Sequence, residues 1–240
     1  MEIPAWLSKL GNNKFEDFEE FKGDITWFIK ATDRVSIKQS KIDLSSDFEA
    51  TFPSLARLVK QARVLSITIN DGTYRMLSWN RKDNKPCGWL CQLESPGVSD
   101  LAILPEHQLL LNNIGGIRES YNPPDDDIFT NNQNFLFIKS ECEQGLGYSQ
   151  VYYDDMCRDL DIDRLPEDNL VMFVEEANGA RTLYDLLTKQ VYLFSHDHCF
   201  NYVTFLEGQP EYTYHLINGV TTFRDYVETL AQQWIAHINF

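Results

Sequence analysis

Residues 180–194 read A-R-T-L-Y-D-L-L-T-K-Q-V-Y-L-F. In this segment two largely apolar stretches flank a polar centre, which runs from Asp185 to Gln190. Short runs rich in aliphatic and aromatic residues favour β-strands, and polar residues between two such runs favour a turn. The segment therefore predicts a strand, a turn and a second strand, which together make a β-hairpin.

A second hairpin is predicted in the first half of the chain. The run V-L-S-I-T-I at 64–69 alternates with period two, N-D-G follows at 70–72, and Thr73 to Trp79 continues as a strand. Asp-Gly between two such runs is a good signal for a tight hairpin turn. Further strands are predicted at Arg34 to Lys38 and at Phe135 to Ile138.

The clearest helix is predicted near the end of the sequence. Thr221 or Thr222 provides an N-cap, and Asp225 lies in the first turn. Apolar residues then recur at the i, i+3, i+4, i+7 spacing that places them on one face of a helix. They are Phe223, Tyr226, Val227, Leu230, Ala231, Trp234 and Ile235.

Three other segments have helical patterns. Residues 14–30 carry phenylalanine and isoleucine at near-helical spacing, and residues 54–61 follow a proline that suits a first helical turn. The third segment is L-P-E-H-Q-L-L-L-N-N-I-G-G-I at 104–117. There Pro105 suits the first turn, and a glycine at 115–116 can take the left-handed conformation that ends a helix.

Composition limits the classes of function. The 240 residues suffice for one large domain or two small ones, and 43% hydrophobic content predicts a folded chain. The formal net charge is −15. A strongly negative surface repels nucleic acid and anionic membranes, and it attracts basic proteins. We therefore expect no nucleic acid or membrane partner, although acidity can also serve solubility alone.

Several features predict a cytoplasmic protein. Met1 to Leu10 contains no extended apolar core of the kind found in secretory signals. The longest apolar runs, such as Leu170 to Val174, are too short to span a bilayer. Five cysteines, an odd number, suggest reduced thiols in a cytosol.

The densest cluster of potential metal ligands is S-H-D-H-C at 195–199. On a strand, His196 and His198 would share a face and could bind one metal ion, with Cys87 and Cys91 as possible further ligands. The alternative, which we favour, is that the cluster is only the polar end of a strand. The sequence has no helical H-E-x-x-H and no paired C-x-x-C.

No other motif predicts catalysis. Cys199 follows His198 directly, but neighbouring residues on a strand point to opposite faces. The glycines at 115–116 and 145–147 lack the other residues of phosphate-binding or dinucleotide-binding loops. The loop Asp125 to Asp127 lacks the spaced ligands of a calcium site. We therefore expect no catalytic residue, no metal and no cofactor.

Residues 141–179 are the most acidic part of the chain, with eleven Asp or Glu against two Arg, a net charge of −9. Tyrosines beside acidic residues suit the binding of a basic protein surface. The alternatives are that the tyrosines pack in the core and that the acids form a solvated face. The candidate partner-binding residues are Tyr152, Tyr153, Asp154, Asp155, Asp159, Asp161 and Asp163.

Three features in order resemble the SUKH superfamily, over roughly residues 98–238. They are the Leu-Pro helix that ends at Gly115-Gly116, the 180–194 hairpin followed by S-H-D-H, and the final amphipathic helix. The resemblance implies an α+β fold with a twisted, largely antiparallel sheet packed by helices. It assigns 96–240 to a SUKH-like domain and leaves 1–95 as an N-terminal α+β segment, which is either an added subdomain or an extension of the same sheet.

The founding members of that superfamily are yeast regulators of cell-wall glucan synthesis, and its bacterial members are mostly taken to be immunity proteins of polymorphic toxin systems. The resemblance therefore implies a non-enzymatic, cofactor-free immunity protein that binds and neutralises a cognate toxin domain. The net charge favours a basic toxin. One alternative is a regulatory or scaffold protein of the same fold without a toxin target. Another is a metal-dependent hydrolase that uses His196 and His198.

Overall fold

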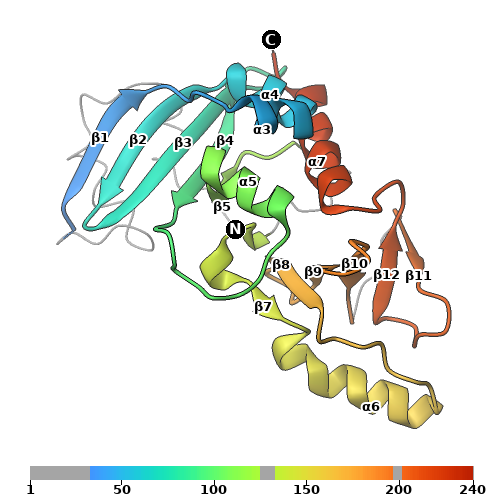
Figure 1. The fold of residues 1–240 in the computed structure, drawn as a ribbon. Helices are drawn as coiled ribbons and strands as arrows, with labels where there is room; N and C mark the ends of the chain where they lie inside the picture. Colours follow the sequence, from blue (N-terminus) through green and yellow to red (C-terminus); the bar gives the residue numbers. More distant parts are fainter. Residues whose placement is uncertain (1–32, 125–132, 197–201, 240) are drawn as a thin grey trace.

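The computed structural model describes residues 33–124, 133–196 and 202–239. They form an α+β fold around one open antiparallel sheet, whose strands follow the order β1-β2-β3-β4-β5-β6-β8-β9-β10-β12-β11, with β7 beside β8 (Figure 1). The helix expected over 14–30, the loop Asp125 to Asp127, His198 and Cys199 lie outside the described residues.

The strands are β1 Val35–Ser40, β2 Arg63–Ile69, β3 Gly72–Asn80, β4 Pro86–Leu93, β5 Gly116–Tyr121, β6 Gln133–Leu136, β7 Glu143–Gln144, β8 Leu170–Glu176, β9 Arg181–Asp185, β10 Val191–Phe194, β11 Val203–Phe205 and β12 Tyr214–Ile217. The α-helices are α3 Ser46–Thr51, α4 Pro53–Lys60, α5 Pro105–Asn113, α6 Gln150–Leu160 and α7 Phe223–His237, and the short 3₁₀ turns are η2 Lys139–Glu141 and η3 Gly147–Ser149.

Both hairpins predicted from the sequence are confirmed. Strands β2 and β3 pair up to Ile69 and Gly72 at the turn, and β9 and β10 pair with Tyr184 opposite Val191. In the second turn the Asp185 carboxylate accepts hydrogen bonds from two backbone N–H groups, those of Leu187 and Thr188, at 2.6 and 2.9 Å. This side chain satisfies backbone donors that the turn leaves unpaired, which explains why an aspartate stands there.

Helix α7 is also confirmed, together with its predicted cap. The Thr222 hydroxyl accepts from the backbone N–H of Asp225 at 3.2 Å, and the Asp225 carboxylate accepts from the backbone N–H of Thr222 at 2.9 Å. Helices α3, α4, α5 and α7 cover one face of the sheet. The core below them contains Trp234 of α7, which packs against Trp79 and Trp89 of the sheet.

One sequence prediction is confirmed here and another needs correction. The helix expected within 104–117 runs from Pro105 to Asn113, and Gly115 has the left-handed conformation predicted for a glycine at 115–116, with a φ of +85°, before the chain enters β5. The buried strand expected over 135–138 ends at Leu136, because Phe137 has a φ of +67° and leaves the extended conformation. At Phe137 a single left-handed residue turns the chain, and the apolar pattern of the sequence did not reveal this turn.

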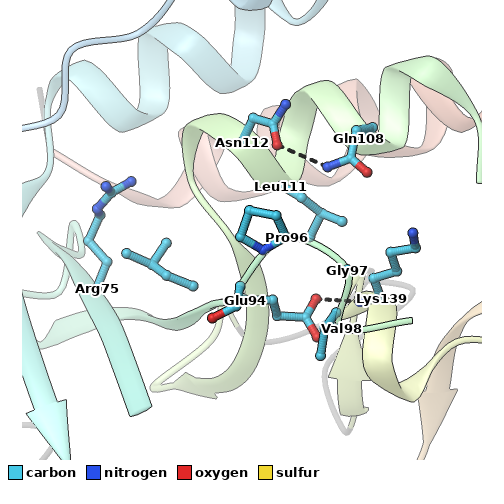
Figure 2. A pocket seen from close by; sticks show the side chains of 11 residues that line it. Arg75, Glu94, Pro96, Gly97, Val98, Gln108, Leu111, Asn112 and Lys139 are labelled. Carbon is cyan, nitrogen blue, oxygen red and sulfur yellow. Dashed lines mark hydrogen bonds between the residues drawn. The ribbon is translucent and has the colours of Figure 1, made fainter. Parts of the chain in front are cut away.

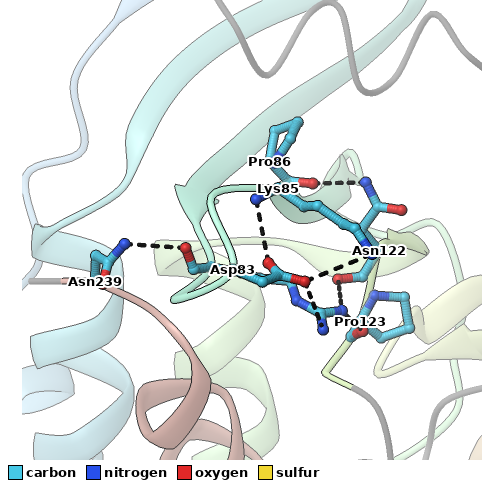
Figure 3. Close-up of polar contacts among 7 residues, drawn as sticks. Asp83, Lys85, Pro86, Asn122, Pro123 and Asn239 are labelled. Atoms are coloured by element: carbon cyan, nitrogen blue, oxygen red, sulfur yellow. Dashed lines mark hydrogen bonds and ion pairs between the residues drawn. The ribbon is translucent and has the colours of Figure 1, made fainter.

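The sheet continues across the boundary expected between residues 95 and 96. Strand β4 pairs with β5, so the described part of 1–95 extends the sheet of 96–240. Figure 3 shows a second link, in which the side-chain amide of Asn239 donates to the Arg81 carbonyl oxygen at 3.0 Å. The buried Arg81 guanidinium in turn pairs with Asp83 at 3.3 Å and donates to the Pro123 carbonyl oxygen at 2.7 Å.

Helix α6 packs on the opposite face of the sheet from α7, over β8, β9, β10 and β12. Strand β8, Leu170–Glu176, is therefore buried on both faces: Met172 points toward α6, whereas Phe173 points into the core under α7. Burial on both faces explains why this strand has a continuous apolar run instead of an alternating one. The sequence reasoning predicted neither β8 nor α6.

A carboxylate of α7 caps α4, which provides a first prediction. Glu228 accepts from the backbone N–H groups of Ser54 and Leu55, at 2.9 and 3.1 Å, where α4 begins. We expect Glu228→Ala to lower the free energy of unfolding by about 1–2 kcal/mol, because free N–H groups remain at a helix start that favours a negative charge. Urea unfolding followed by circular dichroism measures this loss. A loss no larger than that of Glu207→Gln, at an exposed carboxylate, would contradict it.

Candidate functional site

The candidate residues predicted from sequence lie on α6 and in the segment that follows it. The buried side of α6 faces the sheet through Tyr153 and Cys157. The Tyr153 hydroxyl donates to the side-chain oxygen of Gln209 and accepts from the backbone N–H of Leu165 at 2.8 Å. Tyr153 is thus a fully buried residue that fixes α6 to the sheet, and its ring does not contribute to the surface.

Tyr152 is half-buried at the edge of the same core. Its ring centroid lies 6.4 Å from that of Phe194 and 5.9 Å from that of His196. His196 is exposed directly after β10, next to the buried Ser195. Tyr152 and His196 therefore come together at one margin of α6, although sequence reasoning had treated them as unrelated.

Three of the five predicted aspartates contact two arginines. Arg158 pairs with Asp155 at 2.8 Å and lies 3.7 Å from Asp159, and Arg164 pairs with Asp154 at 2.7 Å. The hydrogen bond from Arg164 is the main reason that the pKa of Asp154 lies below its usual value. Asp154 therefore belongs to an internal contact of this segment.

The remaining aspartates extend the negative surface beyond the helix. Asp161 ends α6 with a left-handed φ of 53°, and Asp163 follows in the exposed chain. Five aspartates against two arginines leave this segment with a surplus of three negative charges. Asp155, Asp159, Asp161 and Asp163 are all exposed.

A surface pocket of about 560 Å³ lies beside the end of this acidic segment. Its acidic lining consists of Asp163, Glu167 and Asp168, and Arg164 is its basic residue. Burial raises the pKa of Glu167, whose carboxylate accepts from the side-chain amide of Gln150 at 3.0 Å. A lysine or arginine side chain fits such a hollow by charge.

The candidate residues chosen from sequence leave out two exposed residues with apolar surface next to these acids. Tyr148 and Val151 are 65% and 68% exposed. Tyr148 lies in η3, directly before α6, and Val151 lies in the first turn of α6. Asp155 and Asp159 follow Val151 at i+4 and i+8, so these three share one side of the helix. The helical spacing could have revealed them if α6 itself had been predicted.

The Tyr148 ring packs on a buried arginine side chain. The guanidinium carbon of the buried Arg181 lies 3.9 Å from the ring centroid, a cation–π contact. Arg181 itself is fixed by ion pairs with Glu175 at 3.0 Å and Glu143 at 3.5 Å. An exposed aromatic ring on an immobile support loses little entropy when a partner covers it, which is typical of an interface anchor.

The described residues of the alternative metal site, Cys87, Cys91 and His196, do not come together in the structure. Cys87 and Cys91 belong to the core under α7, whereas His196 lies against Tyr152 on the α6 side of the sheet. Burial raises the pKa of both thiols to about 12, which disfavours the thiolate that metals bind. Among the described residues, no three His, Cys, Asp or Glu side chains converge as a metal site would require.

No family model matches the chain, and no curated protein or solved structure matches it either. Within residues 33–124, 133–196 and 202–239, no helix is long and apolar enough to cross a bilayer. Function must therefore be inferred from the site itself.

Proposed function

We propose that this chain is a non-enzymatic immunity protein of the SUKH superfamily, which acts in the cytoplasm by binding and neutralising a basic toxin domain. The observation that carries the proposal is the outward side of α6. We define the α6 surface as Tyr148, Val151, Asp155, Asp159, Asp161 and Asp163, all of them exposed.

The α6 surface combines the two properties that tight protein binding needs. Tyr148 and Val151 offer apolar area that a partner can bury, at one end of the surface. The aspartates at the other end, together with a chain charge of −15, attract a basic partner and orient it as it approaches. Toxins that act on nucleic acids commonly have basic surfaces, so an acidic inhibitor is complementary to them.

The fold supports the same proposal. The Tyr153 ring fastens α6 to the sheet, with ring centroids 6.1 Å from Phe194 and 5.1 Å from Tyr214. The helix is therefore a rigid platform, and rigid surfaces bind with a smaller entropic cost. The order of α5, the β9–β10 hairpin and α7 corresponds to the three features on which the superfamily resemblance rests.

The proposal is tested with the native partner. Tagged protein is purified from its native cells, co-purifying proteins are identified by mass spectrometry, and each is expressed in a host with and without this chain. The proposal predicts a partner with a basic domain that arrests growth alone and no longer does so beside this chain. A stable partner whose domain is harmless would instead identify a regulatory or scaffold protein.

A charge variant tests the α6 surface directly. We expect Asp155→Asn, Asp159→Asn, Asp161→Asn and Asp163→Asn together to weaken toxin binding by roughly 10-fold or more at low salt, mainly through slower association. Asp154 is left unchanged because it holds Arg164. Association and dissociation rates are measured by surface plasmon resonance at several salt concentrations.

The control variant loses the same number of negative charges from a different part of the surface. Asp43, Asp47, Asp71 and Asp100 are exposed acids away from α6, and their replacement by asparagine also changes the net charge from −15 to −11. If both variants lost affinity equally, long-range charge alone would explain binding. If neither lost affinity, the α6 surface would not be the contact.

A further inference from the structure

A second surface pocket differs from the α6 surface in charge, because the residues that line it carry a net positive charge. It has a volume of about 580 Å³ and opens between the ends of β3 and β4, helix α5 and η2. Figure 2 shows Arg75 and Lys139 on opposite sides of this pocket, with Pro96 and Leu111 between them. We call it the Arg75–Lys139 pocket.

The two cations of this pocket have no ion-pair partner among the described residues. The Arg75 guanidinium donates one hydrogen bond, to the Asn113 carbonyl oxygen at 2.5 Å. Burial lowers the pKa of Arg75, because it removes water from around the guanidinium charge. In a chain with 36 acidic and 21 basic residues, two cations in one pocket that lack an ion-pair partner among the described residues need an explanation.

The one acidic residue that lines the pocket is already engaged. The Glu94 carboxylate accepts from the backbone N–H of Lys139 at 2.7 Å (Figure 2). It also accepts from the backbone N–H of Ser140 at 2.9 Å, and so caps η2. Those two bonds direct Glu94 toward the backbone of η2. The pocket keeps a net charge of +1 from two cations and this carboxylate.

The space between the cations is partly apolar. Leu93, Leu111 and Pro96 line it, and the amide side chains of Gln108 and Asn112, which bond to each other at 2.9 Å, lie along one wall. A volume of this size accommodates a small organic molecule. The arrangement is therefore cationic at both ends and apolar in the middle.

We propose that the Arg75–Lys139 pocket binds a small organic dianion, with one acidic group at Arg75, the other at Lys139, and an apolar spacer against Leu111. Arginine and lysine both bind carboxylate and phosphate groups, so the shared chemistry is two oxyanions joined by a short hydrocarbon chain. This site is independent of toxin binding.

The test uses linear dicarboxylates as probes. Glutarate, suberate and sebacate are titrated into the ¹⁵N-labelled full chain at low ionic strength, and amide shifts are followed by NMR. Octanoate and 1,8-octanediol are the controls with one and no charge. We expect amide shifts at Val98, Leu111, Asn112 and Lys139, which line the pocket, and an optimum spacer length. Suberate or its neighbour in the series should bind at least tenfold tighter than octanoate.

Substitutions of the two cations test whether each of them binds one acidic group of the ligand. Arg75→Gln and Lys139→Gln should each reduce dicarboxylate affinity at least tenfold and leave octanediol unchanged, whereas Lys38→Gln on the exposed side of β1 should have no effect. Lys139→Gln keeps the test valid if loss of the Arg75 bond to α5 impairs folding. A parallel titration with 1,6-hexanediol bisphosphate shows whether phosphate is preferred to carboxylate.

Any of three results would overturn the proposal. One is octanoate or octanediol binding as tightly as the best dicarboxylate, because the second cation would then contribute nothing. Another is dicarboxylate binding that persists equally in Arg75→Gln and Lys139→Gln, and the third is amide shifts that lie away from this pocket.

Discussion

Trp234→Ala is expected to lower the free energy of unfolding by about 3–5 kcal/mol, the range for loss of a large aromatic side chain from a packed core. The Trp234 ring is buried against two others, with centroids 5.6 Å from Trp79 and 4.9 Å from Trp89. Trp79 is itself fixed by a 2.9 Å hydrogen bond from its indole nitrogen to the Leu58 carbonyl oxygen. The substitution therefore leaves a cavity between α7, α4 and the sheet.

This variant also tests whether the chain folds as one unit. Trp234 belongs to 96–240, whereas Trp79 and Trp89 belong to 1–95, so the cluster joins the two segments separated in the sequence-based division. We expect wild type and Trp234→Ala each to unfold in one guanidinium transition, with circular dichroism and tryptophan fluorescence coincident. Arg224→Ala, on the exposed side of α7, should change stability by less than about 0.5 kcal/mol. Two separate transitions would contradict a shared core.

The second large effect is a loss of stability in acid that originates at His107. This fully buried ring binds the Phe137 carbonyl oxygen through Nε2 at 2.7 Å and the Tyr184 hydroxyl through Nδ1 at 3.0 Å. Only the neutral ring can donate to the carbonyl and accept from the hydroxyl at once. Burial lowers the pKa of His107 from 6.5 to about 4, and the nearby Lys139 acts in the same direction.

The direction of the pH effect follows from that shift. Above pH 6.5 His107 is neutral in both the folded and the unfolded chain, so it contributes no pH dependence. As the pH falls from 6.5 to about 4, only the unfolded chain takes up the proton, and folding becomes less favourable. The full difference corresponds to about 3 kcal/mol, lost over that window.

The measurement compares wild type with His107→Gln. Glutamine retains a donor for the Phe137 carbonyl oxygen but does not titrate, so its variant should be less stable at pH 7 and lose less stability between pH 6.5 and 4.5. Urea unfolding at several pH values gives both quantities. His215, whose pKa burial also lowers, is present in both proteins and cancels in the comparison. Parallel pH profiles would show that His107 is not the group responsible.

The parts of the fold that were predicted from sequence are those whose signals are local. The turn at 70–72 and the polar centre at 185–190 mark hairpins because the residues that make the turn lie within it. The N-cap of α7 is equally local, since Thr222 and Asp225 bond to each other's backbone. Long-range pairing, such as β4 with β5 or β6 with β8, has no such local signature.

Helix α6 was missed for a reason that bears on function. Val151 and Leu160 are apolar but exposed, so the apolar residues of Q-V-Y-Y-D-D-M-C-R-D-L do not form one clean stripe. The sequence shows no single apolar face, because apolar residues lie on the outer side of the helix as well as on the buried side toward the sheet. Tyr153 was assigned to the surface for the same reason: without the helix, its direction could not be known.

The acidic residues of the site were predictable because charge density requires no structure, whereas the anchors were not. The position of the Tyr148 ring depends on Arg181, which is 33 residues further along the sequence. The pocket that holds Arg75 and Lys139 likewise depends on contacts between distant segments. Composition thus predicts the sign of a partner's charge, and only the fold shows where that partner can be held.

The measurement that tests toxin neutralisation most directly is a growth assay with the co-purifying basic domain. The domain is expressed alone, with this chain, and with the variant in which Asp155, Asp159, Asp161 and Asp163 are replaced by asparagine. We predict arrest alone, full growth with wild type, and impaired protection by the variant at equal protein levels. Arrest that persists beside abundant wild-type protein would contradict the account.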